Sequence, residues 1–146
     1  MLKKIDHINI VVTDLENAKD FFVDLGFIAD PAKEGKLAGK WIEQVTKLKN
    51  ASGYYCTLTI PGTQTNLELI HYDSPKDKHK FPKSKPHQLG LRHLAFEVEN
   101  LDAIVSQLKK KGVRFFSGIQ DYKQSNKRLC YFYGPDGIIL ELAEYK

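Results

Sequence analysis

The sequence has little of what a disulfide-stabilised or zinc-stapled protein would need. It contains two cysteines, Cys56 and Cys130. They form neither a CxxC pair nor a cysteine–histidine spacing of the kind that binds structural zinc. Both lie in apolar stretches that resemble strands, so we expect buried free thiols. Free thiols are typical of a reducing compartment, which predicts a cytoplasmic protein.

Long apolar runs are also missing. No segment approaches the roughly 20 apolar residues that a membrane-spanning helix requires. The N-terminal stretch MLKKIDHINIVV runs directly into a strand pattern, without the apolar core and small-residue cleavage site of a signal peptide. We therefore expect no association with a membrane.

Positive charge is present but not concentrated. The formal net charge is +4 over 146 residues, and the densest lysine runs, at 76–85 and 109–111, are short. Nucleic-acid-binding proteins usually gather their basic residues on one element, so this distribution predicts no nucleic-acid partner. With 42% hydrophobic residues, the chain is long enough to bury a core of its own.

What the sequence does contain is an internal repeat. The segment Ile5–Phe27 aligns without a gap with Leu91–Val113, which places His7 on His93. Each copy begins with an alternating apolar pattern typical of a half-buried strand. An N-capping residue, apolar positions at helical spacing and a terminating glycine follow, which predict a helix.

The ends of the two halves match as well. The stretch TNLELIHY at 65–72 parallels IILELAEY at 138–145, which places Glu68 on Glu141. Each half is thus predicted to be a strand, a helix and three further strands. The fold class is α+β, with paired βαβββ modules in a single domain spanning 1–146. Module 1 covers residues 1–73, the linker 74–89 and module 2 residues 90–146. The first half has extra residues at 31–53, where WIEQVTKLK forms either a short helix or an active-site flap.

Four polar residues occupy equivalent positions in this repeat: His7, Glu68, His93 and Glu141. Each lies in an otherwise apolar strand, where an unpaired carboxylate costs on the order of several kcal/mol. Taken singly, such residues are more often structural or exposed than ligands. Their agreement in register across a duplicated unit predicts instead that two imidazoles and two carboxylates converge on one divalent metal. Imidazole and carboxylate together suit Ni, Zn, Co, Fe or Mn.

The stretches DHINIVVTDLENAKDFFVDLGF, LEL, RHLAFEVENLDA and GPDGIILEL resemble the vicinal oxygen chelate superfamily. That superfamily includes glyoxalase I, methylmalonyl-CoA epimerase, extradiol dioxygenases and fosfomycin or bleomycin resistance proteins. The resemblance spans nearly the whole chain and implies a U-shaped half-barrel sheet around a metal. It also implies a homodimer, and it places the metal ligands at His7, Glu68, His93 and Glu141.

The ligand order His, Glu, His, Glu is similar to that of bacterial glyoxalase I and implies a metal-dependent lyase or isomerase. In such enzymes a small-molecule substrate with two adjacent oxygens chelates the metal and passes through an enediolate, while Glu68 or Glu141 moves the proton. Trp41, Tyr54 and Arg128 are candidate substrate-binding residues, with core packing or a surface position as the alternative for each.

Three other functions stay open. They are a small-molecule binding or resistance protein, an epimerase like methylmalonyl-CoA epimerase, and a ring-cleaving dioxygenase. Residues 9–12, Asn-Ile-Val-Val, contain no arginine where bacterial glyoxalase I proteins typically have one. The substrate therefore does not follow from the ligand set.

Overall fold

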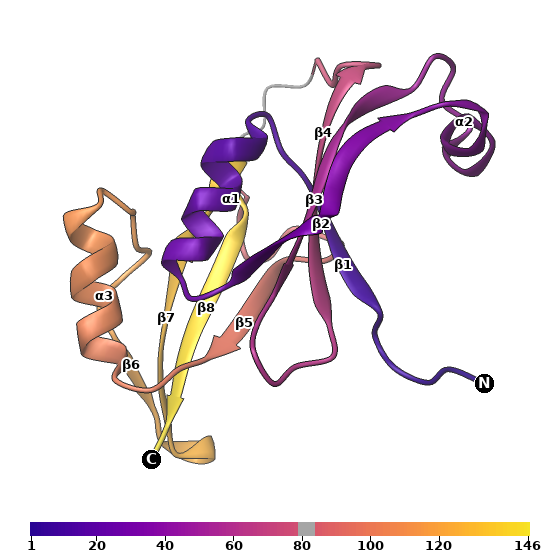
Figure 1. Cartoon of the computed structure of the whole chain (residues 1–146). Coiled ribbons are helices and arrows are strands. Elements are labelled where there is room, and N and C mark those ends of the chain that lie inside the picture. The colour runs from indigo at the N-terminus through magenta and orange to yellow at the C-terminus, as the bar shows by residue number, and fades with distance from the viewer. Residues whose placement is uncertain (79–83) are drawn as a thin grey trace. The chain divides into compact units, whose positions relative to one another are not determined.

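The two halves of the repeat fold into two four-stranded sheets of the same topology. The computed structural model describes residues 1–78 and 84–146, and the chain divides into two units, Met1–His79 and Lys80–Lys146. Their strand orders are β1-β4-β3-β2 and β5-β8-β7-β6 (Figure 1). In each sheet the first and last strands of the unit run parallel, and the other neighbouring strands run antiparallel. The predicted α+β fold of paired βαβββ modules is confirmed.

Both units follow the predicted order of elements. Those of the first unit are β1 (His7–Val11), α1 (Leu15–Asp24), β2 (Ile28–Ala38), α2 (Lys40–Thr46), β3 (Ser52–Thr59) and β4 (Asn66–Ser74). Those of the second are β5 (His93–Glu97), α3 (Leu101–Lys110), β6 (Gln120–Tyr122), β7 (Lys127–Tyr133) and β8 (Ile139–Tyr145), with short 3-10 helices at Lys123–Ser125 and Pro135–Gly137. The units divide within the expected linker, of which residues 79–83 lie outside the described part of the chain.

The same local signals begin and end the long helix of each unit. The side chains of Asp14 and Asn100 accept hydrogen bonds from backbone N–H groups of the first turns of α1 and α3. Such capping satisfies donors that have no partner within the helix. Gly26 and Gly112 follow the helices with φ of +105° and +81°, the left-handed conformation that closes a Schellman motif and that glycine adopts without strain.

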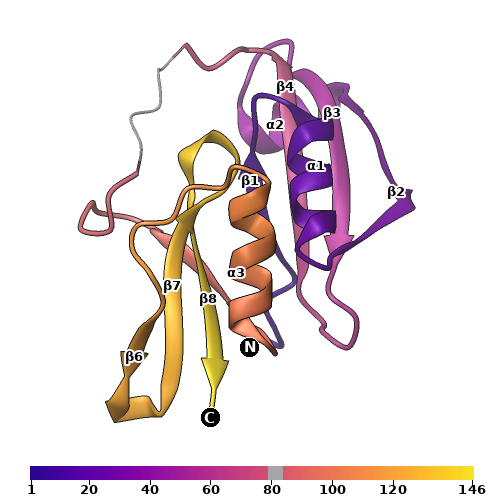
Figure 2. The ribbon, with the colours of Figure 1, turned by 90° about the vertical axis from the view of Figure 1, so that its left-hand side faces the viewer.

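Each long helix buries its apolar stripe against one face of its sheet. Figure 2 shows α1 lying along β3 and β4, and α3 alongside β8. The buried helix residues are Ala18 and Phe22 in α1, and Leu101, Val105 and Leu108 in α3. We call the covered side of each sheet its helix face and the other side its opposite face. Because successive strand residues alternate between faces, register assigns every strand residue to one of them.

The extra residues of the first unit extend its sheet and then form a helix. Strand β2 continues to Ala38, with an irregularity in its pairing between Ala29 and Glu34. The short helix α2 follows, as the helical alternative for this segment predicts. Its buried Ile42 packs with Leu37, Ala51 and Ile70. Ile70 lies on β4, two residues after Glu68. Among the described helices, none combines the length and apolar character needed to cross a membrane.

Candidate functional site

In the first unit, β1 and β4 bring His7 and Glu68 together. The strands run parallel, and Asn9, two residues after His7, is the register partner of Glu68. The side chains of His7 and Glu68 therefore both lie on the face of the sheet that α1 does not cover, its opposite face. His7 Nε2 lies 4.0 Å from Glu68 Oε1, and the two side chains are 47% and 28% exposed. This pair is accessible from solvent within its unit.

Two neighbouring side chains orient this pair. Asp6 Oδ2 lies 3.0 Å from His7 Nδ1, and since a carboxylate only accepts hydrogen bonds, the ring N–H donates. This bond raises the pKa of His7 and lowers that of Asp6. The amide of Asn9 donates to Glu68 Oε1 at 3.2 Å. When a carboxylate accepts the N–H of one ring nitrogen, the other nitrogen is free to bind a metal, an arrangement typical of metal-binding histidines.

In the second unit, β5 and β8 bring His93 and Glu141 together in the equivalent way. His93 Nε2 lies 3.2 Å from Glu141 Oε2. Glu141 is only 4% exposed, and a carboxylate so deeply buried requires a compensating positive charge. Lys127 Nζ, at 3.2 Å from Oε1, supplies one. The hydrogen bond to Glu141 raises the pKa of Lys127.

Tyr131 completes the surroundings of the second pair. It lies directly across from Glu141 on β7, and its ring centroid is 5.0 Å from that of His93. Burial raises the pKa of the Tyr131 hydroxyl, and the charge of Glu141 and a side-chain hydrogen bond to it act in the same direction. The second pair therefore lies in a more enclosed environment than the first.

Each unit thus contains one pair of an imidazole and a carboxylate. Within residues 1–78 and 84–146, no three His, Cys, Asp or Glu side chains are gathered closely enough to hold a metal ion. The expected convergence of all four residues stays a prediction. The donors fit a metal chemically, because each pair presents an Nε2 atom and a carboxylate oxygen from the same face of its sheet.

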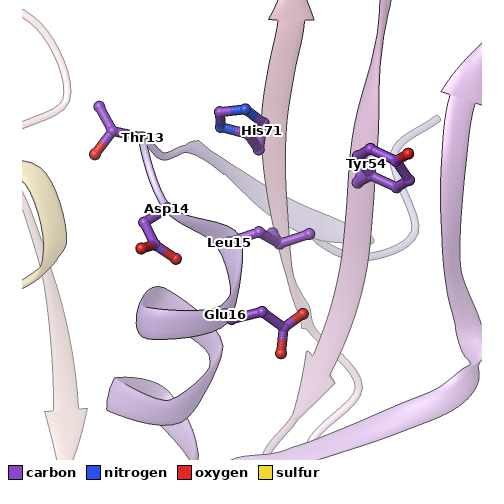
Figure 3. Close-up of a pocket in the computed structure, with 6 residues that line it drawn as sticks. All are labelled: Thr13, Asp14, Leu15, Glu16, Tyr54 and His71. Atoms are coloured by element: carbon purple, nitrogen blue, oxygen red, sulfur yellow. The ribbon is translucent and has the colours of Figure 1, made fainter.

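Tyr54 and Trp41 lie in different places. Tyr54 is on the helix face of the first sheet, where it lines a cavity of about 300 Å³ together with His71 and the first turn of α1 (Figure 3). Its neighbour Tyr55 lies on the same face as Glu68, since Tyr55 pairs with Ile70 and Thr57 with Glu68. Trp41 is 56% exposed on α2, the helix that packs against Ile70.

Arg128 lies on the helix face of the second sheet, away from Glu141. Its guanidinium binds both carboxylate oxygens of Asp102, at 2.9 and 2.7 Å, and Glu144 Oε2 at 3.1 Å. The other oxygen of Glu144 accepts the backbone N–H of Leu101 at 3.0 Å. In this structure Arg128 therefore joins the first turn of α3 to β8.

Sequence reasoning did not identify Asp6, Asn9 or Lys127 as members of the site. Asp6 and Asn9 were detectable, because Asp6 adjoins His7 and Asn9 is two residues further on the same strand face. Lys127 is recognisable only from the pairing of β7 with β8, which places it opposite Tyr145 on the face of Glu141.

Known proteins resemble this chain over nearly its full length. The Bacillus subtilis protein YwkD is 32% identical over 145 residues, which cover 99% of this chain and 98% of that protein. A 2-epi-5-epi-valiolone epimerase from an Actinomyces species is 29% identical over 94% of this chain and 77% of that enzyme. The crystal structure of a glyoxalase family protein from Bacillus cereus superimposes with a TM-score of 0.91, at 29% identity, over 99% of this chain and 95% of that one. The family model for the Glyoxalase/Bleomycin resistance protein/Dioxygenase superfamily matches residues 4–142, and the chain belongs to that superfamily.

Proposed function

We propose that this protein is a metal-dependent lyase or isomerase of the glyoxalase type, with His7, Glu68, His93 and Glu141 as ligands of one divalent metal. The observation that carries the proposal is the repetition of a histidine–glutamate pair at equivalent strand positions of both units. His93 Nε2 and Glu141 Oε2 are 3.2 Å apart, while Lys127 compensates the charge of this buried carboxylate at its other oxygen, Oε1. Mixed nitrogen and oxygen donors suit Ni, Zn, Co, Fe or Mn.

The bound metal would act as a Lewis acid on a carbonyl oxygen of the substrate and make the neighbouring C–H more acidic. The substrate is then a small molecule with two adjacent oxygens. A 2-oxo or 2-hydroxy carbonyl compound has this arrangement. The Actinomyces relative is named as an epimerase, and inversion at a carbon beside a carbonyl requires the same kind of proton transfer.

The surroundings of the two glutamates favour Glu68 as the residue that carries the proton. Glu68 is 28% exposed and is held by the neutral amide of Asn9 at 3.2 Å. Glu141 is nearly buried, with a cationic side chain at one oxygen and an imidazole at the other. A carboxylate that must move between a ligand position and a substrate carbon needs the looser setting, whereas Glu141 suits a fixed ligand.

Isotope exchange tests this function. The protein, loaded with Ni or Zn, is incubated in deuterated buffer with hemithioacetals of 2-oxoaldehydes and with 2-oxo and 2-hydroxy carbonyl compounds. Mass spectrometry then follows deuterium entering beside the carbonyl. The control is Glu99→Gln, which changes an exposed loop residue. We expect the wild type and this control to introduce deuterium into at least one compound faster than free metal does. Glu68→Gln should lose this exchange. If the loaded wild type exceeds free metal on no compound of the panel, the lyase or isomerase assignment is wrong.

A further inference from the structure

Lys127 contacts one of the proposed ligands, Glu141, although it is no ligand itself. Its Nζ is 3.2 Å from Glu141 Oε1, and its side chain is 19% exposed. Register places it on the same face of the second sheet as Glu141 and Tyr131. Its ammonium also lies 5.9 Å from the centre of the Tyr145 ring. The side chain is therefore anchored at the site and still reaches solvent.

This lysine has no counterpart in the first unit. Lys127 pairs with Tyr145, and the residue that pairs with the equivalent Tyr72 is Gly53. A side chain cannot be added there, because a Cβ on Gly53 would lie 2.0 Å from the backbone oxygen of His71. The duplicated fold therefore does not require a cation at this position.

The first unit supports its carboxylate in a different way. Glu68 accepts a hydrogen bond from the neutral amide of Asn9, and the residue that occupies the position of Asn9 in the second unit is Ala95, opposite Glu141. One glutamate is thus held by an amide and the other by an ammonium. In the described part of the chain, the proposed ligand carboxylate with a lysine partner is therefore that of the second unit.

The charge of the complete site follows from this asymmetry. A divalent metal with two carboxylates and two neutral imidazoles carries no net charge, and Lys127 would make the assembly positive. When Glu141 binds the metal, the metal takes over the compensation of its charge. The lysine ammonium, on its flexible four-carbon stem, can then turn to another anionic oxygen nearby.

We infer that Lys127 is a substrate-binding residue whose ammonium binds an anionic group of the chelating molecule. The substrate class is then a vicinal-oxygen compound that carries a carboxylate or a similar anionic group, such as a 2-oxo or 2-hydroxy acid. This inference rests on the proposed function, since the chelating oxygens need the metal. It adds a specificity that the four ligands do not provide.

Calorimetric titration with oxalate, a dianion with two adjacent oxygens, tests the inference. The zinc-loaded wild type is compared with Lys127→Met, Lys127→Gln and Lys127→Arg, and Lys123→Met serves as a matched control in the exposed turn before β7. Zinc content is measured before and after each titration. We expect the oxalate Kd to rise roughly 10-fold or more in the Met and Gln variants, the loss typical of a charge-assisted hydrogen bond. The Arg and Lys123→Met variants should stay within a few-fold of the wild type.

The outcomes separate this inference from the proposed function. If the Met and Gln variants keep their zinc and bind oxalate as tightly as the wild type, Lys127 is no anion-binding residue, while the metal site stands. If the wild type itself binds no zinc, the proposed function is contradicted, and the inference with it. The Gln variant keeps a hydrogen-bond donor for Glu141, so the test does not depend on the folding of the Met variant alone.

Discussion

Asp6 Oδ2 lies 3.0 Å from Nδ1 of the adjacent His7. This contact fixes the imidazole with its Nε2 toward Glu68, and hydrogen bonds of this kind support the ligands of metal sites. We predict that Asp6→Ala lowers the affinity for Zn or Ni about 10-fold, as measured by competition with a chromogenic chelator. Asp102→Ala, which removes a carboxylate on the far side of the second sheet, is the control. Equal affinity in Asp6→Ala and the wild type would show that Asp6 does not orient the ligand.

Phe22 is one of the fully buried core residues of the first unit. It is fully buried in α1, and its ring lies edge-on to that of Phe27 with 5.4 Å between centroids. Phe22→Ala should lower the free energy of unfolding by about 3–5 kcal/mol, because it leaves a cavity in a packed interior. Val23 is the next residue of the helix and is 44% exposed, so Val23→Ala should cost about 1 kcal/mol or less. Denaturant titration of both variants would reveal a loose core if the two losses were equal.

Glu144 and Glu141 lie on the same strand but on opposite faces. Variants of these two residues therefore distinguish an effect on the free energy of unfolding from an effect on metal binding. Glu144 accepts the backbone N–H of Leu101 and binds Arg128. We expect Glu144→Ala to lower the free energy of unfolding by about 1 kcal/mol and to leave the metal affinity unchanged. Glu141→Gln should instead abolish metal binding. Weaker metal binding in Glu144→Ala would argue that the helix face takes part in the site.

The two buried cysteines make the free energy of unfolding depend on pH in the alkaline range. Burial raises the pKa of Cys56 and of Cys130 to about 11, above the value that each thiol has in the unfolded chain. Ionisation therefore favours unfolding, and the stability that these thiols contribute below about pH 9 is lost as the pH rises toward 11. We predict that the free energy of unfolding falls more steeply between these pH values in the wild type than in the double variant Cys56→Ala/Cys130→Ala. Parallel curves for the two proteins would contradict a role for the thiols.

The repeat in the sequence was enough to predict the fold and to place His7 on His93 and Glu68 on Glu141. The contact of His7 with Glu68, and that of His93 with Glu141, depends on the parallel pairing of the first and last strands of each unit, which alternation within a strand does not specify. Adjacent aromatic residues were harder to assign, because Tyr54 and Tyr55 are chemically alike and a shift of one residue exchanges their faces. The positions of Lys127 and Arg128 depend on the pairing of β7 with β8, which brings together residues 14 and 16 positions apart in sequence. Such register is set by the whole sheet and not by any local pattern.

We propose that the histidine–glutamate pairs of both units bind the same metal. Protein freed of metal with a chelator is dialysed against Ni or Zn, and the bound metal per chain is measured by mass spectrometry. The proteins compared are the wild type, His7→Ala, His93→Ala and the control His87→Ala, which alters an exposed loop histidine. We predict one ion per chain in the wild type and the control, and loss of that ion in either ligand variant, although His7 and His93 belong to different units. A wild type without metal, or a ligand variant that still binds one ion per chain as tightly as the wild type, would contradict a shared metal.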